Sequence, residues 1–228
     1  MATTIALVTL YQRLYDAYGP QHWWPAETPF EVMVGAVLTQ NTAWTNVEKA
    51  ISNLQKADKM KLELMKKLTE RRLARLIRPA GYFNVKARRL KNLCCWLSKQ
   101  GGIEELSSWP SEELRTALLE VNGIGPETAD DILLYAFERP VFVIDTYTRR
   151  LMKRLGLIEE EEKKYEVLRA LFERALDPEP YLFNEYHALI VRHSKEKCSR
   201  ESMTGRRVIP GSNMLIDCRH CKVELPFE

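Results

Sequence analysis

Long apolar runs are missing from this 228-residue chain. No stretch reaches the roughly 20 consecutive apolar residues that cross a bilayer. The opening residues 1–5 lack the basic segment and small-residue cleavage site of a secretory signal. Low-complexity segments and clear internal repeats are also missing. We therefore expect a soluble intracellular protein, monomeric and without membrane contact.

Cysteine is scarce, and its number is odd: the chain has five. An odd number without an export signal argues against a disulfide framework. Cys94 and Cys95 lie within an apolar helical pattern and are expected to pack in the core. The other three stand near the C-terminus.

The net charge is only +3, so bulk charge says little about partners. Its distribution says more, because basic side chains gather at residues 71–91 and 149–154 and an acidic run occupies 159–162. Such a one-sided field could hold phosphates. Ordinary solvated helix faces are the alternative.

Alternating strand patterns are nearly absent, whereas apolar residues recur at three- and four-residue spacing. This periodicity predicts an all-α protein, and an apolar content of 45% suffices for a core. From Thr204 onward the periodicity ends in an irregular tail. The expected helices cover residues 3–18, 29–39, 43–56, 60–67, 70–77, 84–100, 111–120, 126–138, 145–155, 162–176 and 181–197.

Two glycines stand between two predicted helices in the segment Val121–Asp130. Gly123 and Gly125 allow positive φ and close approach of the backbone to a partner. The amides of this turn, with the N-terminus of the helix that begins at Pro126, form a set of donors suited to a phosphate. An ordinary interhelical turn is the alternative.

One aspartate follows a segment that looks buried. The apolar residues 141–144 are interpreted as a buried connector, and Asp145 comes directly after them, at the start of a basic helix. An aspartate in this place can be a helix N-cap. It can also be a functional carboxylate, and spacing alone leaves both open.

The ordered set of motifs resembles the endonuclease III superfamily of helix-hairpin-helix DNA glycosylases. The resemblance runs from about Phe30 to Cys198 and rests on four segments, Val34–Thr42, Arg78–Ala87, Val121–Leu151 and His187–His193. It implies double-stranded DNA as the partner, with the damaged base flipped out of the helix because a stacked base cannot be reached. The expected location becomes the cytoplasm or nucleoid.

The resemblance implies that Asp145 is the catalytic carboxylate. A fixed negative charge stabilises the oxocarbenium character of the sugar more than the ground state, and the same group can orient a water. Glu127 stands where the bifunctional members have their lysine. A carboxylate cannot form a Schiff base, so we expect a monofunctional enzyme with little or no lyase activity.

Further motifs are similar to those of the type III 3-methyladenine DNA glycosylases. They are Leu38–Thr42, Glu127–Asp130 and the doublet Trp23-Trp24 before Pro25. By this resemblance Trp24 and Trp44 line the base pocket, where indoles would attract a cationic alkylated purine. Core packing is the alternative for either tryptophan. The subfamily's modified lysine after His-Gly has no counterpart at His187-Ala188 and is not carried over.

The superfamily often ends in four cysteines that hold a [4Fe–4S] cluster. Cys198 fits the first position, and Cys218 and Cys221 fit the central pair. The interval before Cys218 is longer than usual, and a fourth cysteine is missing, although such clusters normally need four thiolates. Zinc bound by three cysteines and His193 or His220, or a tail without metal, are the alternatives.

The resemblance also implies the architecture: two helical domains flanking a DNA-binding cleft. A helical bundle with the hairpin is expected at residues 28–138, and a second domain at 1–27 with 139–228. The implied DNA contacts are the amides of Gly123 and Gly125, with a possible bound monovalent cation, and the side chains of Lys86 and Arg149. Asn41 is the candidate for filling the gap left by the flipped base, with Gln40 beside it.

Two other functions stay open at this point. One is a bifunctional glycosylase and AP lyase for oxidised pyrimidines, which Glu127 disfavours. The other is a helix-hairpin-helix module that binds DNA without catalysis.

Overall fold

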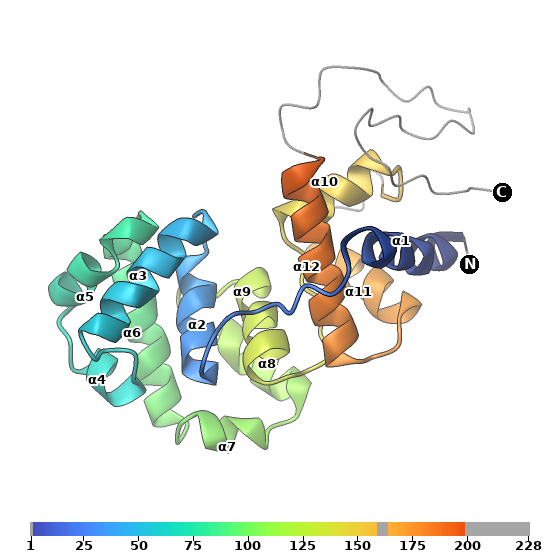
Figure 1. The fold of residues 1–228 in the computed structure, drawn as a ribbon. Coiled ribbons are helices and arrows are strands. Elements are labelled where there is room, and N and C mark those ends of the chain that lie inside the picture. Colours follow the sequence, from blue (N-terminus) through green and yellow to red (C-terminus); the bar gives the residue numbers. More distant parts are fainter. Residues whose placement is uncertain (1, 159–163, 199–228) are drawn as a thin grey trace. The chain divides into compact units, whose positions relative to one another are not determined.

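The computed structural model describes residues 2–158 and 164–198. These residues form helices joined by turns and extended segments, with no β-strand among them, so the prediction of an all-α fold is confirmed. The chain divides into two compact units (Figure 1). The hairpin unit is Trp24–Arg139, and the terminal unit combines Met1–Trp23 with Pro140–Glu228.

In the hairpin unit, α2 (Pro29–Leu38) is apolar apart from Glu31, and its residues from Phe30 onward are buried. Such a helix belongs in the middle of a core, and α2 packs against α3, α6, α9 and η2. The elements of this unit that follow α2 are α3 (Trp44–Lys56), α4 (Leu62–Lys66), α5 (Glu70–Leu76), η1 (Arg78–Ala80), α6 (Phe83–Lys99), α7 (Ile103–Ser107), α8 (Ser111–Leu119), α9 (Pro126–Asp131) and η2 (Ile132–Ala136).

Three details of this unit differ from the expectation. The short helix α7, which directly follows the positive-φ pair Gly101 and Gly102, has too few residues to show a period. The single helix expected at residues 126–138 is divided, because its second half, η2, winds as a π-helix. Cys94 is buried as expected, whereas Cys95 on the same helix is exposed.

The terminal unit contains α1 (Ala2–Tyr18), α10 (Thr146–Arg154), α11 (Tyr165–Ala175) and α12 (Pro180–Glu196). Helix α1 packs against α11 and α12, and α10 packs against α12. The core centres on Phe142, whose ring stacks on Phe172 with centroids 4.0 Å apart. None of the described helices is both long enough and apolar enough to cross a membrane.

Candidate functional site

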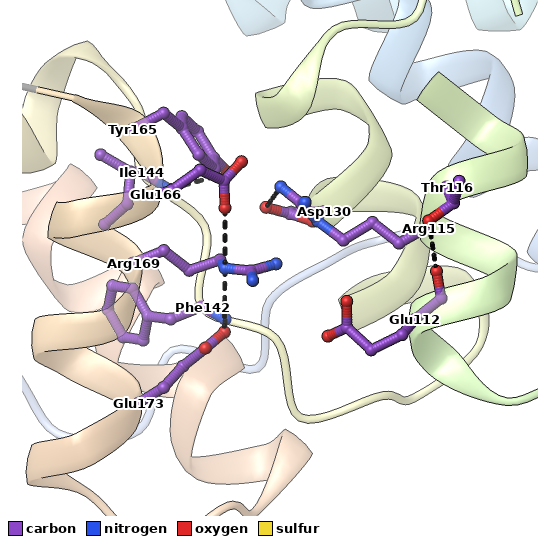
Figure 2. A network of polar contacts seen from close by, with 10 residues as sticks. All are labelled: Glu112, Arg115, Thr116, Asp130, Phe142, Ile144, Tyr165, Glu166, Arg169 and Glu173. Carbon is purple, nitrogen blue, oxygen red and sulfur yellow. Dashed lines mark hydrogen bonds and ion pairs between the residues drawn. The ribbon is translucent and has the colours of Figure 1, made fainter. Parts of the chain in front are cut away.

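The connector that precedes Asp145 is buried, as the sequence predicts, and α11 fixes its path. The amide of Phe142 donates to Oε1 of Glu173 at 3.1 Å, and the amide of Ile144 donates to the Tyr165 hydroxyl at 3.4 Å (Figure 2). Backbone groups that cannot reach water are thereby satisfied. The backbone that leads to Asp145 is therefore held in place by α11.

Asp145 is the N-cap of α10. Its backbone is extended, with φ −94° and ψ −176°, and its Oδ1 accepts from the amide of Thr148 at 2.7 Å. Asp145 therefore does cap the helix, as one of the two interpretations predicts, but the cap bond uses only one carboxylate oxygen. The side chain is 13% exposed. Capping and chemistry are compatible here, because the second oxygen is directed elsewhere.

The second oxygen of Asp145 faces a histidine. Nε2 of the buried His187, on α12, lies 3.5 Å from Oδ2. Burial by itself raises the pKa of the Asp145 carboxyl, but the hydrogen bond and charge of His187, together with the Thr148 amide, bring that pKa below its ordinary value of 3.8. Asp145 is therefore ionised at neutral pH.

The hairpin consists of α8, the turn at residues 120–125 and α9. A buried ion pair joins its two helices: Arg115 on α8 donates to both carboxylate oxygens of Asp130 on α9, at 2.6 and 3.1 Å (Figure 2). Bidentate geometry of this kind fixes both side chains. Pro126 is the first residue of α9, as predicted, and Glu127 follows it on the exposed side of the first turn. An acidic residue there suits the helix dipole.

The two glycines of the turn differ in what they require. Gly123 has φ +102°, and a Cβ on it would collide with the side chain of Arg89. Gly125 has an extended backbone with φ −99°, and a Cβ there would meet open space. The first glycine is thus demanded by the fold itself, whereas the second leaves the N-terminus of α9 accessible to a ligand.

Gln40 connects the loop after α2 (residues 39–43, called the loop below) to the hairpin. Its Nε2 donates to the Gly123 carbonyl at 3.1 Å and to the Thr128 hydroxyl at 2.9 Å, while Arg89 donates to its Oε1. Asn41, by contrast, is exposed and has a left-handed backbone with φ +53°. The two neighbours therefore have different roles: Gln40 holds the loop and Asn41 projects from it.

The expected phosphate contact at Lys86 needs correction. Lys86 is only 1% exposed, and its ammonium donates to the carbonyls of Leu38 and Ala80, both at 2.8 Å, and to the Thr42 hydroxyl at 2.6 Å. Burial lowers the pKa of this lysine to about 8. The basic character of Lys86 predicts a surface position, whereas the residue lies on the buried face of α6. Lys86 fixes the loop from inside.

Trp24 and Trp44 meet edge to face, with centroids 5.0 Å apart and planes at 85°. Tyr135 on η2 is also 5.0 Å from the Trp24 ring. We call these three residues the aromatic cluster. A Cβ on Gly35 would lie 3.1 Å from the Trp24 ring, so this glycine of α2 admits the indole. The rings are not parallel, and sequence reasoning missed Tyr135.

Tyr82 was also missed. It is 72% exposed with φ +44° and lies next to the segment whose Ala80 carbonyl accepts from Thr42 of the loop. Its signal in the sequence was an aromatic directly after Gly81 at a helix start. The predicted phosphate contact Arg149 is partly exposed, and its guanidinium lies 5.8 Å from the Tyr165 ring.

Of the predicted metal ligands, the structure describes Cys198 alone; Cys218 and Cys221 lie outside the described residues. The Cys198 thiol is buried and accepts from the Arg154 guanidinium at 2.5 Å. Within residues 2–158 and 164–198 no group of three potential ligands could hold a metal. The three tail cysteines of this sequence fall short of the four thiolates of a [4Fe–4S] cluster, so the donor set does not fit that cofactor.

Comparison with known proteins identifies the family. A family model described as the HhH-GPD superfamily base excision DNA repair protein matches residues 34–178, a range that includes the loop, the hairpin and Asp145. The chain belongs to this superfamily. The expected resemblance is confirmed, and the chain is a base excision repair DNA glycosylase of the helix-hairpin-helix type.

Individual relatives agree with the family. A Methanocaldococcus jannaschii protein, provisionally named a DNA repair glycosylase, is 47% identical over 85% of this chain and 89% of its own length. The structure of the Helicobacter pylori 3-methyladenine DNA glycosylase bound to 1,N6-ethenoadenine is similar, with a TM-score of 0.73 and 32% identity over 86% of this chain and 99% of the other. A non-covalent endonuclease III–DNA complex has the same fold, with a TM-score of 0.75, 21% identity and coverage of 88% and 90%.

Proposed function

We propose that this glycosylase is monofunctional and releases alkylated purines, such as 3-methyladenine, from double-stranded DNA. The observation that carries the proposal is the Asp145 carboxylate, which is ionised in a buried site. By the resemblance, Glu127, in the first turn of α9, stands at the hairpin position of the lyase lysine. The likeness to the Helicobacter pylori 3-methyladenine glycosylase supports the substrate class.

The reaction follows from the charge of Asp145. The bond between C1′ and the base nitrogen breaks, and the base leaves with the bonding electrons, so a cationic alkylated purine departs neutral. The sugar becomes an oxocarbenium ion, which the Asp145 carboxylate stabilises in a site with little water. Water then adds to C1′ and loses a proton, with Asp145 or solvent as acceptor, and an abasic site remains.

The aromatic cluster is proposed as the base-recognition surface. Electron-rich rings attract a cationic base more than a neutral one, which would favour alkylated over undamaged purines. The perpendicular arrangement of Trp24 and Trp44 offers one indole face to a base rather than a slot between two parallel faces. The proposal therefore requires stacking on one ring, or a rotation of Trp44.

The hairpin and the loop are proposed as the main DNA-binding elements. The amides of Gly123 and Gly125 would bind a phosphate, directly or through a monovalent cation, and Arg149 would bind another. Asn41 and Tyr82, both exposed on left-handed backbone, are the candidates for filling the space of the flipped base. Phosphate contacts of this kind make affinity fall steeply with salt.

A panel of duplexes tests the substrate class. Purified protein is incubated with separate duplexes that bear 3-methyladenine, 1,N6-ethenoadenine, thymine glycol, uracil or mispaired adenine, and the released base is measured. We expect release of the alkylated purines without strand cleavage. Release of thymine glycol with a borohydride-trapped adduct would instead mean a bifunctional enzyme. If no base is released but the duplex is bound, the chain is a binding module.

Asp145→Asn is the matched variant for this panel. Asparagine caps a helix about as well as aspartate, so the fold and the affinity for DNA should persist while base release is lost. A variant that releases base at the wild-type rate would remove Asp145 from the proposed chemistry.

A further inference from the structure

One buried titratable group next to the proposed catalytic carboxylate has no part in the mechanism so far. His187 projects from α12 toward Asp145, its side chain is only 6% exposed, and its Nε2 is 3.5 Å from Oδ2. Helices α10 and α12 pack against each other, so this contact is set within one unit. We infer that His187 is a positioning residue, which fixes the second oxygen of Asp145 and favours the charged form of its carboxylate.

The inference rests on the proposed function of Asp145, and it starts from a conflict in that function. The carboxylate must be ionised to stabilise a sugar cation, yet it must be sheltered from water for its charge to act strongly. Shelter alone favours the protonated acid. The cap bond from Thr148 supports the charge at Oδ1, and His187 is placed to support it at Oδ2.

His187 is the charged partner that acts on the Asp145 carboxyl. The other causes of its shifted pKa are burial and the bonds from Thr148. Four charged or titratable side chains on the helices packed on α12 also have contacts with other groups. They are Arg149, near the Tyr165 ring; Arg150, bonded to the carbonyls of Ser194 and Cys198; Arg154, bonded to the Cys198 thiol; and Tyr18, bonded to His193.

Protonation need not be permanent for His187 to act. A neutral imidazole with its proton on Nε2 donates to Asp145, and a protonated one adds attraction. The contact therefore supports the carboxylate across the pH range in which a glycosylase works. The chemistry itself stays with Asp145, since His187 acts through it.

Two substitutions separate positioning from packing. His187→Phe fills the space without a donor or charge, and His187→Gln keeps a donor without a charge. Single-turnover release of 3-methyladenine from an alkylated duplex, corrected for spontaneous release, is measured from pH 4.5 to 9, with DNA affinity followed by anisotropy. In His187→Phe we expect the acid limb of the rate to move up by about one pH unit or more, with unchanged affinity. At pH values below the acid limbs of both proteins, each pH unit of displacement makes the variant ten times slower than wild type. His187→Gln should fall between that variant and wild type.

A second measurement needs neither a lesion nor a folded Phe variant. Carbon-13 NMR of labelled aspartate follows the ionisation of Asp145 in the free protein, and Asp145→Asn assigns the signal. We expect the wild-type carboxyl to titrate below its ordinary range and that of His187→Ala, which has neither donor nor charge, to titrate higher. An Asp145 that titrates in its ordinary range in wild type, or at the same pH in wild type and His187→Ala, would overturn the inference. Because this readout is independent of base release, it can fail or succeed apart from the proposed function.

Discussion

The two glycines of the hairpin turn offer a sharp test of the structure. Gly123→Ala and Gly125→Ala add the same methyl group two residues apart and keep every amide proposed to bind phosphate. At Gly123 the backbone has φ +102°, where a residue with a Cβ loses roughly 1–2 kcal/mol. The new Cβ would also collide with Cγ of Arg89 and would lie 2.9 Å from its Cδ and 3.0 Å from its Cβ, so this side chain must move.

The displacement of Arg89 has its own cost. Its bond to Gln40 would be strained or lost, and a bond to a charged group contributes about 1.5–3 kcal/mol. Against this, alanine restricts the unfolded chain and returns about 0.4–1 kcal/mol. We therefore expect Gly123→Ala to destabilise the protein by about 2–4 kcal/mol. Gly125→Ala, with φ −99° and open space around it, should be neutral or stabilise by up to about 1 kcal/mol.

Urea denaturation compares the two variants with wild type, and salt-dependent DNA binding is measured beside it. If the Gly125 amide meets a phosphate, the added methyl should weaken DNA binding without weakening the fold. Equal midpoints for the two variants would refute the reasoning about Gly123. Unchanged affinity in Gly125→Ala would refute a close approach of the phosphate at that residue.

Three further predictions concern side chains. Because Lys86 loses its proton at about pH 8 when folded but only near 10.5 when unfolded, the unfolded chain binds more protons between these values. The free energy of unfolding should therefore gain a rising component with pH in that window, and Lys86→Met should abolish this component in urea titrations at pH 7.5 to 10. Tyr82→Ala, at a 72% exposed site, should change stability by less than about 0.5 kcal/mol, whereas loss of base stacking should weaken DNA binding by about 1–3 kcal/mol in anisotropy titrations. Phe172→Ala should cost about 3–5 kcal/mol in thermal or urea unfolding, because the fully buried ring stacks on Phe142.

The helical fold could be predicted because its signal is local. A period of three to four residues, a proline at the first helical position and a glycine after the last one act within a single element. The buried connector before Asp145 was visible for the same reason. The π-helical second half of the helix after Pro126 was not visible, since the extra residue in its turn depends on how η2 packs against α2.

The roles of the polar residues were harder to predict, because they depend on partners far along the chain. The ammonium of Lys86 donates to Leu38 and Thr42, more than 40 residues earlier, and the amide of Gln40 donates to Gly123 and Thr128, more than 80 residues later. Composition treats a lysine as a surface charge, and that general preference led to the surface prediction for Lys86. A polar side chain in an otherwise apolar helical face was the signal available for Lys86.

The same limit explains how Asp145 could be identified without its surroundings. The sequence offered two interpretations of this residue, a helix cap and a functional carboxylate, and the structure makes them parts of one arrangement. A cap bond orients the carboxylate and uses one of its oxygens, so the other is left in a fixed direction. That direction meets His187, which is 42 residues away in the numbering and sits on the inner face of α12. A capping aspartate whose second oxygen faces a buried histidine needs more than capping to explain it, because one oxygen is enough to cap.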